Sequence, residues 1–275
     1  MSRSAHSASP TAGPCATIVP VRPYDDLTES GRTRRLVAAA RPILAEHYGV
    51  SIVRTRPQRR SFNRLVRVDL ADGQSLALRI SPTQRIHADE VEAIEHRWLT
   101  HLADTSSVTA PRLVPDRHGR VRHRLSVDGL DGPRTLTVFT WLRGRRIPRL
   151  TGPDRAHQLG RLAARLHRSA AGLDISDEWQ QACRADDPVT FAPCDGLHRY
   201  RGSDRNLVHE AHARVCTVVA ELWKHPPHPP HLVHGDLGPH NVLVHRNQMR
   251  PLDFQDLLWG FTVQDTCISL ADMER

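Results

Sequence analysis

The sequence is almost without lysine: among 38 basic residues, Lys224 is the single lysine and the others are arginine. A bias of this kind that runs through a whole chain is typical of general composition rather than of one binding face. The net charge of +8 is spread over every segment, and aromatic residues, at 5%, are not interleaved with the basic ones. Since net charge alone governs only non-specific association, we predict no specific nucleic-acid partner.

Paired cysteines and long apolar runs are also missing. The five cysteines are scattered without a C-x-x-C pair, which argues against a disulfide framework or zinc ribbon and favours reduced thiols. No apolar run approaches the roughly 20 residues of a membrane span, and residues 1–20 lack the apolar centre of a secretory signal. We therefore predict a cytoplasmic protein without a membrane partner, with a disordered tail over residues 1–20. The sequence does not determine an oligomeric state.

The first half of the chain reads as a small sheet with two helices. A helical pattern over 33–48, with a kink expected at Pro42, ends at Gly49. Alternating apolar residues predict strands over 51–56, 65–70, 75–80, 121–127 and 136–141, and Asp72-Gly73 predicts a hairpin turn. A further helix is expected over 89–102.

The second half is mainly helical, with expected helices over 154–171 and 206–224, a weaker one within 174–187, and a last apolar segment over 263–275. A linker is expected near 142–152. The prediction is thus an α+β chain of two lobes: a β-rich N-terminal lobe over 21–144 and a helical C-terminal lobe over 145–275, with a ligand cleft between them.

The stretch with the strongest chemical signal runs from His231 to Asp256. Two short apolar runs flank Asn247 and predict a hairpin, which would bring Asp236 and Asn241, before its first strand, close to Asp253 at the end of its second. One carboxylate can take the proton of an acceptor hydroxyl, while an amide oxygen and another carboxylate hold Mg²⁺ against phosphates. The alternative is a buried polar turn whose side chains bond to backbone amides.

Histidines recur every third residue up to and into the start of this stretch, at His225, His228, His231 and His234, and the first three follow one another in a proline-rich segment. In a polyproline II conformation they would share one face but lie too far apart for compact metal chelation, because that helix rises about 3.1 Å per residue. We interpret the segment as a stiff linker, and His234 as a core histidine that orients the loop after it.

Several motifs in order resemble the aminoglycoside phosphotransferase and choline kinase-like family, whose members are relatives of the protein kinases. The strongest are His234-Gly-Asp-Leu-Gly-Pro-His-Asn241 and Leu252-Asp-Phe-Gln-Asp256. Weaker ones are Ser61-Phe-Asn63, Leu76-Ala-Leu-Arg-Ile80, the helix with Glu95, Val138-Phe-Thr-Trp-Leu-Arg-Gly144 and Leu159-Gly-Arg-Leu-Ala-Ala-Arg-Leu-His167. The resemblance spans residues 61–272.

The resemblance implies a two-lobed protein-kinase-like fold and an ATP- and Mg²⁺-dependent kinase that phosphorylates a hydroxyl of a small molecule. The residues and their implied roles are Asp236 as catalytic base, Asn241 and Asp253 as Mg²⁺ ligands, Arg79 at the ATP phosphates with Glu95 as its partner, Ser61 and Asn63 at the end of the phosphate-covering loop, the backbone of Phe139, Thr140 and Trp141 at the adenine edge, and Asp265 as a structural brace of the catalytic loop.

The sequence departs from the family pattern in three places. Arginine replaces lysine at position 79, and the loop before Ser61 contains no glycine, so phosphate contact there would come from side chains. Relatives usually continue beyond the point where this sequence ends, so a C-terminal truncation is expected, or an open acceptor pocket.

Alternatives remain for two residues and for the function. Arg79 could be an exposed strand arginine, and Glu95 could pair with Arg85 or Arg97. A protein serine/threonine kinase and a catalytically impaired nucleotide-binding relative are the alternative functions, and the identity of the acceptor is not encoded in these motifs.

Overall fold

The computed structural model describes residues 22–58, 62–83, 89–105, 108–127, 132–147, 152–184, 186 and 201–271. In the N-terminal part, a five-stranded antiparallel sheet has the order β1-β2-β3-β5-β4. Its strands are β1 (Ile52–Pro57), β2 (Arg64–Leu70), β3 (Ser75–Ile80), β4 (Arg122–Leu125) and β5 (Arg134–Thr140). All five predicted strands are thus confirmed, although β4 is shorter than residues 121–127.

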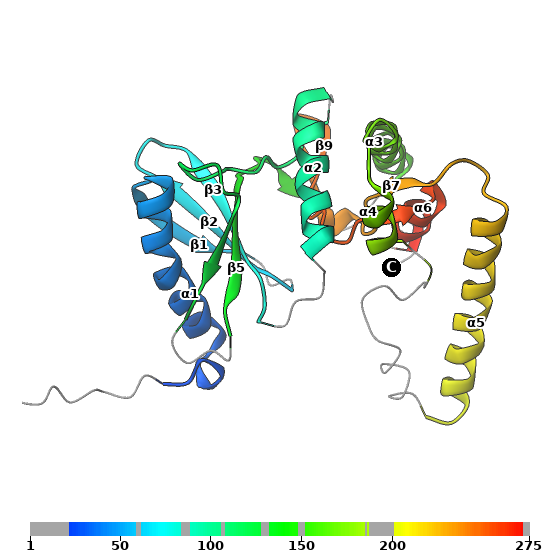
Figure 1. Cartoon of the computed structure of the whole chain (residues 1–275), viewed down its shortest axis with the longest axis horizontal. Helices are drawn as coiled ribbons and strands as arrows, with labels where there is room; N and C mark the ends of the chain where they lie inside the picture. Colours follow the sequence, from blue (N-terminus) through cyan, green and yellow to red (C-terminus); the bar gives the residue numbers. More distant parts are fainter. Residues whose placement is uncertain are drawn as a thin grey trace, which may run out of the picture.

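The two faces of this sheet contact different parts of the molecule, because successive side chains along a strand point to opposite faces. Leu76, Leu78 and Ile80 of β3 pack into a cluster with helix α1 (Glu29–Ile43), which covers the outer face (Figure 1). Ala77 and Arg79 face the opposite side, toward helix α2 (Asp89–Thr105) and the cleft. The pleat of β3 therefore places one arginine on the inner face.

Helix α1 begins four residues earlier than expected, because Thr28 caps it by accepting a hydrogen bond from the Gly31 amide at its Oγ1. Pro42, where we expected a kink, lies one residue before the end of α1. The chain continues as a π-helical turn, η2 (Leu44–Tyr48), and stops at Gly49 in the left-handed conformation. A short 3₁₀ turn, η1 (Tyr24–Asp26), precedes α1.

Helix α2 joins the two lobes through a shared apolar core. Its buried Ile94, Trp98 and Leu102 belong to one cluster with Phe139 from the sheet and Phe254 from the C-terminal part. The rings of Trp98 and Phe254 meet edge to face, with centroids 5.2 Å apart. This contact fixes α2 against the segment that follows β9.

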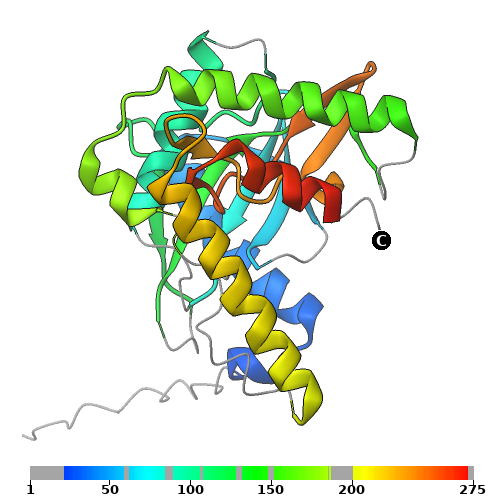
Figure 2. The same ribbon diagram turned by 90° about the vertical axis from the view of Figure 1, so that its right-hand side faces the viewer.

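The C-terminal part holds the helices α3 (Pro153–Ala171), α4 (Asp177–Ala182), α5 (Ser203–Lys224) and α6 (Thr262–Ala271). Two small strand groups lie among them: β7 (His231–Val233) pairs with β10 (Leu258–Gly260), and β8 (Val242–His245) forms the predicted hairpin with β9 (Gln248–Pro251). A turn of 3₁₀ helix, η4 (Pro239–Asn241), precedes β8. Figure 2 shows α3 running across this part of the molecule, near α6.

The expected linker contains a strand that we did not predict. Within it, β6 (Arg145–Arg146) pairs antiparallel with β8, so the start of the C-terminal part is hydrogen-bonded directly to the hairpin. The division at residue 144/145 stays a prediction.

The interpretation of the histidine-rich segment before β7 as a stiff linker stays a prediction. The rings of His228 and His231 lie 5.4 Å apart. Contacts of His228 with the Pro229 carbonyl and with Thr262 Oγ1 of α6 turn its ring inward.

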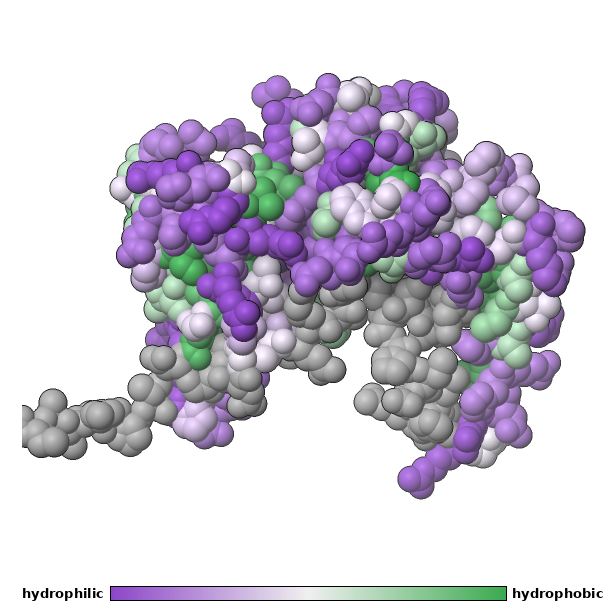
Figure 3. All heavy atoms as spheres, viewed as in Figure 1, coloured by the Kyte–Doolittle hydropathy of each residue, from purple (hydrophilic) through white to green (hydrophobic). Residues whose placement is uncertain are grey.

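Helix α5 stands away from the other described elements along most of its length (Figure 1), but near its end the ring of Trp223 meets that of Phe261 with centroids 4.9 Å apart. None of its residues is buried, and Leu207, Val215 and Val218 are exposed. Figure 3 shows apolar and polar surface mixed along this helix. Across the described residues, no helix combines the length and the apolar character needed to cross a membrane.

Candidate active site

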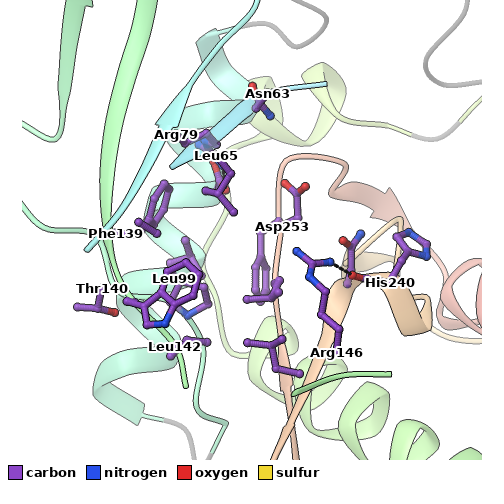
Figure 4. A pocket seen from close by; sticks show the side chains of 18 residues that line it. Asn63, Leu65, Arg79, Leu99, Phe139, Thr140, Leu142, Arg146, His240 and Asp253 are labelled. Atoms are coloured by element: carbon purple, nitrogen blue, oxygen red, sulfur yellow. Dashed lines mark hydrogen bonds and ion pairs between the residues drawn. The ribbon is translucent and has the colours of Figure 1, made fainter. Parts of the chain in front are cut away.

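A cleft of about 420 Å³ lies between the sheet and the β8–β9 hairpin. Figure 4 shows side chains entering it from both lobes. Polar and charged residues from both sides line the cleft, and apolar residues form part of its wall. The polar and charged ones include Asn63, Arg79, Glu95, Thr140, Arg146, His240, Asn241 and Asp253, and the apolar ones include Phe139, Trp141 and Leu142.

Asp236 lies in the loop between β7 and η4, immediately after a tight turn at Gly235. Gly235 has φ +78°, and a Cβ atom there would collide with the Asp256 carbonyl, so only glycine fits this turn. The half-buried Asp236 carboxylate is held from two sides. Asn241 Nδ2 donates to its Oδ2 at 2.6 Å, and His240 Nε2 lies 3.0 Å from the same oxygen.

Asn241 is oriented by this contact. Its Nδ2 donates both to the carboxylate and, at 3.0 Å, to the backbone carbonyl of Asp236. With the amide nitrogen turned to Asp236, the amide oxygen is the atom of Asn241 that can bind a cation. The predicted partners are thus brought together by two hydrogen bonds.

Asp265 of α6 holds the loop that carries Asp236 through hydrogen bonds. Its Oδ2 accepts from the His234 amide at 2.9 Å and from His167 Nε2 at 2.8 Å, and its Oδ1 accepts from the Gly235 amide at 2.8 Å. Burial acts to raise the pKa of Asp265, but the hydrogen bonds from His167 and from the His234 amide help to outweigh it, and the pKa is lowered. The carboxylate therefore pins the backbone just before Asp236.

His234 connects the loop to the segment after β9. Its buried ring lies with Nε2 2.9 Å from the Leu252 carbonyl, so Nε2 carries the proton, and Nδ1 accepts from the Asp236 amide at 3.4 Å. Because Leu252 precedes Asp253, one imidazole fixes the backbones of both predicted acidic site residues relative to each other.

Asp253 follows β9 in the left-handed conformation, with φ 57°, which short polar residues such as aspartate tolerate better than most others. Its side chain projects into the cleft (Figure 4). Burial raises the pKa of Asp253; Arg79 opposes this shift, whereas Asp256 and Glu95 add to it. A bound cation would be stabilised by these neighbouring negative charges. The side chains of Asp253 and Asn241 offer oxygen ligands, which Mg²⁺ prefers.

Arg79 and Glu95 form a buried, two-fold ion pair. Arg79 Nη1 and Nη2 donate to Glu95 Oε1 and Oε2 at 2.7 and 2.6 Å, and the side chains are 10% and 1% exposed. The guanidinium carbon lies 4.7 Å from the centroid of the Phe139 ring. Arg79 is therefore not an exposed strand arginine, and Glu95 pairs with it rather than with Arg97.

Two backbone amides of the segment expected at the adenine edge already donate hydrogen bonds within the protein. The amide of Thr140 donates to the Arg112 carbonyl at 2.8 Å, and that of Trp141 to the Ser75 carbonyl at 3.2 Å. Because these two N–H groups already donate within the protein, the predicted contact with adenine would have to come from other backbone groups of this segment. Leu142, the next residue, also lines the cleft.

Of the two residues predicted for the phosphate-covering loop, Ser61 lies outside the described residues. Asn63 is buried at the rim of the cleft, and its Nδ2 donates to Gln255 Oε1 of the opposite lobe. This places Asn63 at a contact between lobes.

Sequence reasoning missed two charged or titratable residues of the cleft. His240 was part of a quoted motif, yet its spacing of four residues from Asp236 went unused. Arg146 lies in the unexpected strand β6, and its Nη1 donates to the His240 carbonyl at 2.8 Å (Figure 4). No local pattern marks Arg146 among 37 arginines, because the pairing of β6 with β8 is what brings it here.

Comparison with known proteins gives a consistent result. The model of the phosphotransferase enzyme family matches residues 55–275. Among curated proteins there is no significant match.

Solved kinases share the architecture. An amicoumacin kinase in complex with AMP-PNP, Ca²⁺ and Ami gives a TM-score of 0.67 at 18% identity and covers 90% of this chain and 72% of that one. A microcompartment-associated aminopropanol kinase gives 0.58 at 25% identity, with 86% and 75% covered. An aminoglycoside phosphotransferase from Alicyclobacillus acidocaldarius gives 0.52 at 16% identity, with 82% and 69% covered. Because the family model spans most of the sequence and the two-lobed kinase architecture is shared, the chain belongs to the phosphotransferase enzyme family and is a phosphotransferase of the protein-kinase-like fold.

Proposed function

We propose that the protein transfers the γ-phosphoryl group of ATP, with Mg²⁺, to a hydroxyl group of a small molecule. The observation that carries the proposal is the cleft lined by Asn241, Asp253 and the buried Arg79–Glu95 pair, with Asp236 hydrogen-bonded to Asn241 beside it. These are the groups that phosphoryl transfer needs: a base for the hydroxyl, oxygen ligands for a cation and a positive charge for phosphates.

Asp236 is the proposed base. In the reaction, the acceptor oxygen forms a bond to the γ-phosphorus, the bond from that phosphorus to the ADP oxygen breaks, and the hydroxyl proton passes to Asp236. The contacts from Asn241 and His240 hold the carboxylate in one orientation, so less ordering is required when substrate binds.

Asn241 Oδ1 and the Asp253 carboxylate are the proposed ligands of Mg²⁺. Their fit rests on the amide nitrogen of Asn241 being turned to Asp236 and on the crowding of Asp253 with Asp256 and Glu95. When bound, the cation would neutralise charge on the phosphate oxygens. The residues themselves supply the fixed oxygens.

Arg79 is the proposed phosphate-binding cation in place of lysine. Glu95 and the Phe139 ring restrict its motion, so its position is set before nucleotide arrives. Because Nη1 and Nη2 each donate one hydrogen bond to Glu95, the remaining N–H groups of the guanidinium are the ones that would contact phosphate oxygens.

A small-molecule acceptor is favoured by the family and by the names of the similar kinases, which act on amicoumacin, aminopropanol and aminoglycosides. The test is incubation of the purified protein with ATP, Mg²⁺ and a pool of metabolites, followed by mass spectrometry for a new phosphate ester and by measurement of ADP.

Asp236→Asn should lower turnover by about 10²–10⁴-fold, the range that a positioned acid–base group contributes, and Asp253→Asn should also lower it strongly because it weakens a proposed metal ligand. Asp154→Asn, at an exposed position in the first turn of α3, is the matched control and should keep full activity. Full activity of Asp253→Asn would contradict the proposed metal ligand. Phosphate found on protein rather than on metabolites would contradict the small-molecule acceptor.

A further inference from the structure

A second cluster of metal-type donors lies in the N-terminal lobe. His47 is in the π-helical turn after α1, Asp116 is in the loop before β4, and His123 is in β4. Their ligand atoms all lie within 4.8 Å of one another, and none of these three residues lines the cleft. The cluster is thus separate from the site that we assign to phosphoryl transfer.

Asp116 supplies a buried negative charge. Its side chain is fully buried, and its Oδ1 accepts from the backbone amides of His118 and Arg120, each at 2.8 Å. Arg120 Nε also donates to Oδ2 of Asp116. Two backbone amides and one side chain therefore hold the carboxylate in place.

The Arg120 guanidinium occupies the position where a cation would contact this cluster. Its Nε donates to Asp116 Oδ2 at 2.9 Å, and its Nη2 lies 3.2 Å from His47 Nδ1. Because a guanidinium only donates hydrogen bonds, Nδ1 of His47 must present its lone pair toward it. The arginine side chain is 53% exposed and can swing into solvent.

His123 points a buried nitrogen at the same carboxylate. Its Nε2 lies 3.4 Å from Asp116 Oδ2, its side chain is 6% exposed, and within the described part of the chain Nε2 has no hydrogen-bond partner. A buried polar atom without a partner is unfavourable and needs an explanation. Ligands about 2.0–2.1 Å from a tetrahedral ion lie about 3.3 Å apart, which is close to the spacing that His123 and Asp116 already have.

We propose that His47, Asp116 and His123 form a binding site for a divalent transition-metal ion of the Zn²⁺ type, which displaces Arg120. Two imidazoles and one carboxylate are a donor set that suits such ions, with water in the remaining position. The rings of His47 and His123 are stacked with centroids 4.8 Å apart, and the Nδ1 lone pair of His47 already faces the position that Arg120 would leave. The ion would fasten the end of the α1 helical segment to β4.

The test is titration of the metal-free protein with ZnCl₂ in a calorimeter. One tight site is expected. His47→Gln and His123→Gln should weaken it at least about tenfold, a loss that even an outer-shell partner of a metal causes when it is removed. Arg120→Gln should tighten it, because this change removes the competing cation and keeps the metal ligands. His157→Gln, an exposed histidine on α3, is the matched control and should leave the affinity unchanged.

In the calorimeter, either of two results would overturn the proposal: equal Zn²⁺ affinity in wild type and His47→Gln, or weaker binding in Arg120→Gln. If His123→Gln does not fold, His47→Gln and Arg120→Gln still decide the question, because both side chains are partly or largely exposed. Co²⁺ gives a second readout. A visible absorption band of tetrahedral Co²⁺ should form in wild type and be lost in His47→Gln; a band that persists there would also overturn the site.

Discussion

The buried pair Arg79–Glu95 leads to a quantitative prediction for Glu95→Gln. This change keeps the shape of the side chain but leaves a buried guanidinium opposite a neutral amide. Removal of one partner of a buried ion pair costs about 3–5 kcal/mol. Arg79 retains the Phe139 ring and the charge of Asp253, so we expect the lower end of this range. A loss of about 3 kcal/mol corresponds to a fall of about 6–12 °C in Tm for a chain of this size.

Replacing both partners separates stability from function. In Arg79→Met/Glu95→Leu, apolar side chains of similar volume take the place of the pair, a change that is often neutral or stabilising. We expect this double variant to unfold near the wild-type midpoint. If Arg79 binds phosphates as proposed, the same variant should lack phosphotransfer activity.

Urea unfolding followed by tryptophan fluorescence, together with ADP release, measures both effects. The matched control is Glu221→Gln, which breaks the exposed pair with Lys224 on α5 and should cost about 0–1 kcal/mol. A loss below about 1 kcal/mol in Glu95→Gln would refute the assignment of a buried, tightly coupled pair. Activity in the double variant would refute a role of Arg79 at the phosphates.

Three further predictions concern the loop and its supports. Gly235→Ala should lower the free energy of unfolding by about 2–4 kcal/mol, because the left-handed backbone and the collision with the Asp256 carbonyl add up; unchanged urea midpoints would contradict the crowded turn. Asp253→Gly and Asp253→Ala should both be inactive, but the glycine variant should be more stable by about 1 kcal/mol owing to φ 57°; equal melting curves would argue against strain there. The pKa of Asp265 is lowered in the folded protein, so its stabilising effect should be complete above the unfolded pKa of about 3.9 and be lost as pH falls through the folded pKa. Asp265→Asn should therefore be less stable than wild type at pH 7 and differ less from it in acid, and a pH-independent difference in urea titrations would count against this.

Elements with a local signal could be predicted from the sequence. The alternation in β2 and β3 fixed which residues of β3 face α1, and the spacing around Asn247 located the β8–β9 hairpin. Asp236, Asn241 and Asp253 are close together because that hairpin is short, and a short hairpin leaves little conformational freedom. The pairing of Arg79 with Glu95 followed from a resemblance, and the pleat of β3 supplies its physical basis.

Features that depend on contacts between distant segments could not be predicted. Strand β6 is two residues long and forms only because β8 offers an edge. The amides of Thr140 and Trp141 are taken by Arg112 and Ser75, which no pattern within 138–144 reveals. His47, Asp116 and His123 belong to three separate segments, so their cluster exists only in the folded sheet.

Two of the contacts between the lobes differ in kind, which bears on how the cleft opens. The cluster around Trp98 and Phe254 joins the lobes by apolar packing, whereas at the rim the hydrogen bond from Asn63 to Gln255 spans them. A neutral hydrogen bond contributes about 0.5–1.5 kcal/mol, which changes the ratio of closed to open molecules by about two- to twelvefold. We therefore expect the lobes to rotate slightly about the contact between Trp98 and Phe254, so that the cleft opens most on the Asn63 side. The hydrogen bond between Asn63 and Gln255 would then shift the equilibrium toward closed molecules.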